Sequence, residues 1–160
     1  MSDETWVPDP HCGPVDGRAW DADAEARAIG RVEIFNATRP DGLDGWTMSV
    51  ERYSFLREHI LDAIDRGVAK SQRVQLGEVI QAAKDRYSGN QMFRHARVRN
   101  LALYVALDLQ ARCEIEATPN GRSSLLRRSG VASALVDRAV SVSPTETPQL
   151  SKITVSPNRR

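Results

Sequence analysis

The sequence predicts an α+β protein that is mainly α with a small antiparallel sheet. Three segments, at about residues 49–67, 77–87 and 93–112, repeat apolar side chains at intervals of three and four, as amphipathic helices do. Two short runs follow, joined through Asn120-Gly121, a dipeptide that favours a tight hairpin turn. The chain has 160 residues and is 41% hydrophobic, which suits one domain with tails.

Residues 1–30 are acidic, and we expect them to form a poorly ordered arm. Seven carboxylates stand against Arg18 and Arg27, and proline and glycine are frequent. Trp6 and Trp20 nevertheless indicate that something packs there, either this domain or a partner. Four alanines in residues 20–29 are compatible with a short helix.

The next segments predict a strand, a loop and the first helix of the domain. Residues 31–36 alternate polar and apolar side chains, which is typical of a short strand, and residues 39–42 form a turn. Residues 43–48 are expected to be a loop that carries Trp46. Ser49 is a suitable N-cap for the helix that follows, and Gly67 is expected to end it.

Two more helices and a hairpin complete the predicted domain, which spans residues 31–128. A very short strand at 74–76 precedes the second helix, and residues 88–90 are turn formers. The third helix is apolar on two sides, so we expect its second face to be covered within the monomer or to contact a partner. That second face consists of Ala96, Leu103, Tyr104 and Leu107. Residues 129–160 are expected to form a short helix or extended segment and then a flexible tail.

The order strand, helix, helix, helix, hairpin resembles the winged helix-turn-helix superfold over about residues 31–128. In proteins of that superfold that act as regulators, the third helix enters the major groove and the hairpin, or wing, touches the DNA backbone or minor groove. The chain is also similar to a small bacterial family of unknown function. That similarity is carried by Val32-Glu33-Ile34-Phe35-Asn36, by Val50-Glu51-Arg52-Tyr53 with Leu56-Arg57, and by Val74-Gln75-Leu76-Gly77-Glu78.

Basic residues concentrate where this resemblance would place DNA. Residues 84–128 hold nine lysines and arginines against four acids, although the whole chain has a net charge of only +1. Arginine forks suit phosphates and guanine, and asparagine can read adenine. The candidate DNA-binding residues are Arg94, His95, Arg97, Arg99, Asn100, Arg122, Arg127 and Arg128.

An alternative interpretation is that these arginines pair within the protein, with Glu114, Glu116 or the acidic arm. The protein would then be an interaction module that keeps the winged-helix fold and uses its apolar faces, without DNA. Either function is compatible with a homodimer. A continuous exposed basic face favours double-stranded DNA as the partner, and internal pairing favours a protein.

Other classes of function find little support in the sequence. It holds no nucleophile motif, phosphate loop or Ser-His-Asp pattern, so we expect neither an enzyme nor a cofactor nor a small-molecule substrate. His11-Cys12 lacks the further ligands that a metal needs. Two distant cysteines, no signal peptide and no long apolar run predict a cytoplasmic protein without a membrane span.

Overall fold

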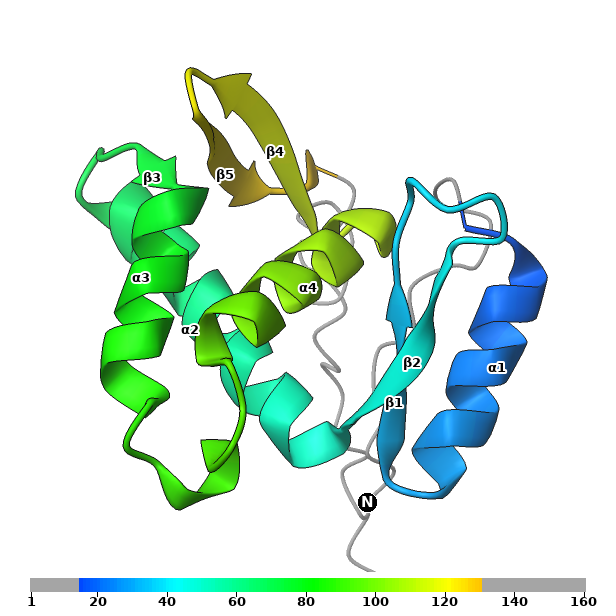
Figure 1. Cartoon of the computed structure of the whole chain (residues 1–160). Coiled ribbons are helices and arrows are strands. Elements are labelled where there is room, and N and C mark those ends of the chain that lie inside the picture. The colour runs from blue at the N-terminus through cyan, green and yellow to red at the C-terminus, as the bar shows by residue number, and fades with distance from the viewer. Residues whose placement is uncertain (1–14, 131–160) are drawn as a thin grey trace, which may run out of the picture.

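The computed structural model describes residues 15–130 and confirms the α+β class (Figure 1). The helices are α1 (Gly17–Ala28), α2 (Val50–Ala69), α3 (Leu76–Tyr87) and α4 (Val98–Ala111), with a 3₁₀ turn η1 (Gln91–Phe93) before α4. The strands are β1 (Arg31–Phe35), β2 (Leu43–Ser49), β3 (Val74–Gln75), β4 (Ile115–Asn120) and β5 (Ser123–Arg128). Two antiparallel sheets result, one of β1 and β2 and one in the order β3-β5-β4.

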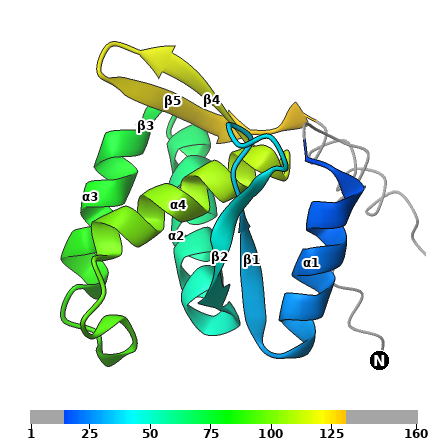
Figure 2. The same ribbon diagram turned by 45° about the vertical axis from the view of Figure 1, so that its right-hand side comes forward.

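The sheet of β1 and β2 forms a layer between α1 and the helices α2 and α4 (Figure 2). Successive side chains of β1 point to opposite faces of the sheet, so β1 contributes to the packing on both faces. Val32 and Ile34 enter the main core with α2 and α4, whereas Phe35 packs with Trp20 of α1. The three-stranded sheet packs over the C-terminal end of α2 and the start of α3 (Figure 1).

The expectation of a poorly ordered arm is wrong for residues 17–28, which form α1. Asp16 caps this helix by accepting from the Arg18 backbone N–H at 3.2 Å. Trp20 is buried with its ring edge against Phe35, at 5.0 Å between ring centroids. The folded unit therefore includes α1 and does not begin at residue 31. Residues 1–14 of the expected arm, and the expected tail from residue 131 onward, lie outside the described residues.

Residues 43–49 are a strand, β2, where the sequence predicted a loop. β2 pairs with β1 in the register Val32 opposite Met48 and Glu33 opposite Thr47. Met48 is buried in the main core, and Trp46, on the same side of the strand, packs against that core. The period-two signal was hidden because Asp44 and Gly45 are poor strand formers.

The predicted first helix is confirmed, but Gly67 does not end it. Ser49 accepts a hydrogen bond from the Arg52 backbone N–H, as an N-cap does. The helix continues through Gly67 to Ala69. Gly67 allows Val74 to pack closely against the helix, because a Cβ at position 67 would lie 2.1 Å from Cγ2 of Val74.

The third predicted helix begins five residues later than expected, at Val98. Asn90 caps the η1 turn by accepting from the Met92 N–H at 2.9 Å, and Phe93 is buried beneath it. His95 then adopts a φ of 62°, a left-handed conformation that a helix cannot contain. Residues 94–97 consequently form a loop.

The predicted hairpin is confirmed as β4 and β5. Its turn is shifted by one residue, because Asn120 pairs with Ser123 and leaves Gly121-Arg122 at the tip. Gly121 has a φ of 62°, which suits glycine at the first position of a two-residue hairpin turn. The short predicted strand before the second helix is also confirmed, as β3, which pairs with β5.

A candidate nucleic-acid interface

The start of α4 presents a group of exposed basic side chains. Arg94 and His95 lie in the loop before the helix, Arg97 is its N-cap residue, and Arg99 and Asn100 are in its first turn. All five are exposed to solvent. Within residues 15–130, no carboxylate forms an ion pair with Arg94, Arg97 or Arg99.

The hairpin contributes less than the sequence indicated. Arg122 is exposed at its tip. Arg127, however, pairs with Glu116 of the neighbouring strand, and Arg128 forms a two-pronged contact with Asp65 of α2 at 2.8 and 3.0 Å. Each of these two guanidinium groups already contacts a carboxylate of the chain, whereas Arg122 has no ion-pair partner among residues 15–130.

The apolar second face of α4 is divided between different environments. Ala96 precedes the helix and packs against the core, and Tyr104 packs against Trp46 of β2 at 5.3 Å between ring centroids. Leu107 is half-buried. Leu103 is 39% exposed. The strand that covers part of this face is β2, which the sequence had not revealed.

A buried charge network fixes the far end of α4. Arg112 donates to Asp108 at 2.9 Å, to Asp23 of α1 at 2.8 Å and to the Glu33 carbonyl of β1 at 2.8 Å. Asp108 also accepts from the Tyr53 hydroxyl of α2 and from the Phe35 backbone N–H. The network therefore joins α1, β1, α2 and α4, and it orients the helix whose other end carries the exposed arginines.

The pKa values of the two carboxyl groups in this network move in opposite directions. Burial raises the pKa of Asp108 above its ordinary value. Burial acts in the same direction on Asp23, but hydrogen bonds and charge from Arg112 and Arg27 outweigh it and lower the pKa of Asp23. The polar atoms of the network are hydrogen-bonded to one another and to the backbone of β1, so the network joins these elements.

A pocket of about 390 Å³ lies beside the candidate interface, and sequence reasoning missed it. Arg31, Trp46 and Arg52 line it together with Leu101 of the first turn of α4. Arg31 and Arg52 are 21 positions apart and showed no shared motif. The only sequence signal was Trp46, a large aromatic residue in a segment that was predicted to be a loop.

No helix in the described part of the chain combines the length and the apolar character that crossing a membrane requires.

Comparison with known proteins places the chain in a family but does not assign it a function. Neither the curated proteins nor the solved structures contain a match to this chain. The model of a family of unknown function, DUF6958, matches residues 31–125, which is more than half of the chain. The chain therefore belongs to this family of unknown function, DUF6958.

Proposed function

We propose that this protein is a regulator-like, DNA-binding protein of the winged helix-turn-helix type, located in the cytoplasm. The order α2, β3, α3, α4, β4, β5 supports this assignment, with β5 between β3 and β4 in the sheet. In that arrangement α4 is the helix that would approach the major groove, and the hairpin of β4 and β5 is the wing. α1 and the sheet of β1 and β2 are additions on the side of α4 away from α3 (Figure 1).

The observation that carries the proposal is the set of exposed arginines at the start of α4. Arg94, Arg97 and Arg99 have no ion-pair partner among residues 15–130, whereas the arginines of the hairpin strands do. A planar guanidinium free of internal partners can bind a phosphate or the edge of guanine with two hydrogen bonds. Arg122 at the hairpin tip is a fourth exposed candidate.

Ion pairs within the protein reduce the number of arginines in the proposed DNA interface. The guanidinium groups of Arg127 and Arg128 are engaged by Glu116 and Asp65. We therefore restrict the proposed DNA contacts to Arg94, His95, Arg97, Arg99, Asn100 and Arg122. α1 carries several acids, but it lies at the opposite side of the molecule from η1 and does not cover these residues (Figure 1).

Fluorescence anisotropy of a labelled duplex of two helical turns tests the proposal. The full chain should bind the duplex with an affinity that falls steeply as salt increases, because phosphate contacts release counterions. The double variant Arg97→Glu/Arg99→Glu should bind at least about tenfold more weakly and show a shallower salt dependence. Arg18→Glu on α1, which reverses one exposed arginine on the far side, is the control. It is matched in charge to the single variant Arg97→Glu, which should weaken binding where the control does not. Absence of binding at low salt, or equal losses in the control, would contradict the proposal.

The alternative proposal is a protein-interaction module, and one observation favours it. Leu103 is exposed on α4, and half-buried Leu107 follows one turn later on the same face. Apolar side chains that are exposed to solvent suit contact with a protein surface, including a second copy of this chain, better than contact with DNA. Sedimentation velocity tests whether this face forms a dimer, because Leu103→Lys should dissociate a dimer formed through it. A dimer is compatible with either function, so the duplex titration above distinguishes the two. The same variant should not weaken DNA binding by an isolated monomer.

A further inference from the structure

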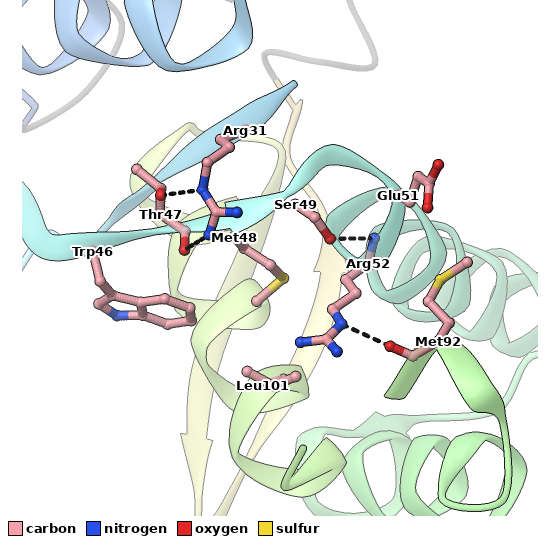
Figure 3. Close-up of a pocket in the computed structure, with 9 residues that line it drawn as sticks. All are labelled: Arg31, Trp46, Thr47, Met48, Ser49, Glu51, Arg52, Met92 and Leu101. Carbon is pink, nitrogen blue, oxygen red and sulfur yellow. Dashed lines mark hydrogen bonds between the residues drawn. The ribbon is translucent and has the colours of Figure 1, made fainter. Parts of the chain in front are cut away.

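The pocket of about 390 Å³ lies where β2, the start of α2 and the first turn of α4 meet (Figure 3). This volume falls within the range of about 300–1,000 Å³ that is usual for small-molecule sites. The pocket is open to solvent on one side, and the side chains that line it come from segments far apart in the sequence. All of them lie inside the segment that matches the family model, residues 31–125.

Two guanidinium groups border this pocket, and each is held by oxygen atoms of neighbouring strands or turns. Arg31 donates from Nε to the Thr47 hydroxyl at 2.6 Å and from Nη2 to the Thr47 carbonyl at 2.8 Å. Arg52 donates from Nε to the Met92 carbonyl at 2.7 Å. Both Nη groups of Arg52, and Nη1 of Arg31, have no hydrogen-bond partner within residues 15–130.

This arrangement contrasts with that of the arginines that form ion pairs within the fold. Those arginines each have a carboxylate partner: Arg27 with Asp23, Arg57 with Glu114, Arg112 with Asp23 and Asp108, and Arg128 with Asp65. Arg31 and Arg52 have none among the described residues. Glu51 lines the pocket, but Figure 3 shows its carboxylate pointing away from the Arg52 guanidinium. Arg52 is half-buried and Arg31 is exposed. Each is a cation that hydrogen bonds orient and that has no counterion among the described residues, so each is complementary to an anion.

The remaining walls of the pocket are apolar. Met48 lies between the two arginines, Leu101 forms one side, and the flat indole of Trp46 forms another (Figure 3). The indole N–H of Trp46 already donates to Asp44 at 2.6 Å, so the ring offers its face and not its donor. A ligand that fills this space would therefore place an apolar or aromatic body against Trp46 and Leu101.

We propose that this pocket binds a small carboxylate with an apolar or aromatic body. The carboxylate lies against the free Nη groups of Arg52 and Arg31, and the body lies between Trp46, Met48 and Leu101. Arginine suits this task because its planar fork matches the two oxygens of a carboxylate. The site does not depend on DNA binding, because it uses neither the loop before α4 nor the hairpin.

The proposal is tested with sodium benzoate, its neutral analogue benzamide, and inorganic phosphate, each titrated into the full chain at constant ionic strength. The Trp46 indole N–H resonance, assigned with Trp46→Phe, reports occupancy of the pocket. Benzoate should shift it saturably, with a Kd in the millimolar range or tighter. Benzamide and phosphate should bind about tenfold more weakly or worse, since one lacks the charge and the other the apolar body. Absence of a saturable shift with benzoate, or equal affinity for all three probes, would overturn the proposal.

Two variants and a control locate the site. Arg31→Gln removes an exposed charge, and Arg52→Lys keeps the charge but loses the fork; each should weaken benzoate binding by about tenfold. Arg18→Gln on α1 is matched to Arg31→Gln and should bind benzoate as the unaltered chain does. Circular dichroism establishes that each variant is folded. Benzoate binding that survives both pocket substitutions in folded protein would refute the assignment.

Discussion

At the scale of single residues, Arg112 shows how a buried charge can be used to assemble a fold. The side chain of Arg112 is only 2% exposed. Two carboxylates and the ring of Phe35 enclose its guanidinium, and the centroid of that ring lies 3.9 Å away. Burial works against its charge, but Asp108, Tyr53 and Asp23 raise the pKa of Arg112, so it remains a cation. Removing one partner of such a group leaves uncompensated buried charge.

We predict that Arg112→Met lowers the free energy of unfolding by about 3–5 kcal/mol, because Asp108 and Asp23 would lose their common cation. Urea unfolding at neutral pH measures the loss. The matched control is Arg128→Met, which breaks a partly exposed pair with Asp65 and should cost no more than about 1 kcal/mol. Equal losses in the two variants would show that the buried network contributes no more than a surface pair.

The buried residue His59 predicts a pH dependence of stability. Its Nε2 lies 3.0 Å from the Val79 carbonyl, while Nδ1 is buried with no partner among residues 15–130. Burial lowers the pKa of His59 below its ordinary value of 6.5, despite the opposing hydrogen bond to Val79. The unfolded chain therefore binds a proton at a higher pH than the folded chain does. The stability contribution of neutral His59 is complete above pH 6.5 and is lost as pH falls below it.

We expect the free energy of unfolding to decrease below pH 6.5 by up to about 1.4 kcal/mol per pH unit until the folded pKa is reached. His59→Gln keeps a donor for the Val79 carbonyl but cannot titrate. Urea midpoints on the two sides of this pH should therefore differ more for the natural chain than for the variant. Parallel pH profiles for the two proteins would be evidence against a neutral, buried His59.

At the scale of elements, the contact between the end of α2 and β3 depends on a missing side chain. Gly67 lies inside α2, and Val74 of β3 sits where its Cβ would be. The backbone between them turns back on itself, with the Gln72 N–H donating to the Gly67 carbonyl at 2.8 Å. Helix propensity alone would favour alanine at this position by about 1 kcal/mol.

We predict that Gly67→Ala destabilises the protein by about 1–3 kcal/mol, because overpacking against Val74 and the Gln72 carbonyl exceeds the gain in propensity. Gly17→Ala in α1 is the control, since no atom lies within 4 Å of a Cβ built there. Thermal or urea unfolding compares the two. Adding Val74→Ala should recover part of the loss. A Gly67→Ala protein at least as stable as the parent would contradict the close contact.

At the scale of the whole molecule, α4 is the element on which the other layers meet. α2 and α3 pack against one side of it, and the sheet of β1 and β2 packs against another (Figure 2). Its first turn and the loop before it remain exposed and basic, and the pocket with Arg31 and Arg52 opens beside that turn. The two proposals use separate arginines and separate readouts, so the failure of one leaves the other intact.

The sequence alone was sufficient for the α+β class, for α2, α3 and the hairpin, and for the exposed arginines at the start of α4. These features depend on local signals, namely apolar side chains at helical spacing, a serine cap and a turn dipeptide. It also pointed to the family, through short runs near residues 32, 50 and 74. Each of these signals lies within a few consecutive residues.

Only the tertiary structure decided the rest, because those features depend on contacts between distant residues. β2 exists because β1 pairs with it, and α1 is ordered because Trp20 meets Phe35 and because Asp23 meets Arg112, 89 positions away. The sequence offered Glu116 as an internal partner for the basic residues, but only the fold shows that Arg127 takes it, that Arg128 pairs with Asp65, and that Arg97 has no ion-pair partner among residues 15–130. The pocket of Arg31 and Arg52 likewise forms only when β2, α2 and α4 meet. The sequence identifies the charged residues, but the tertiary contacts determine which of them form ion pairs within the protein and which can bind a ligand.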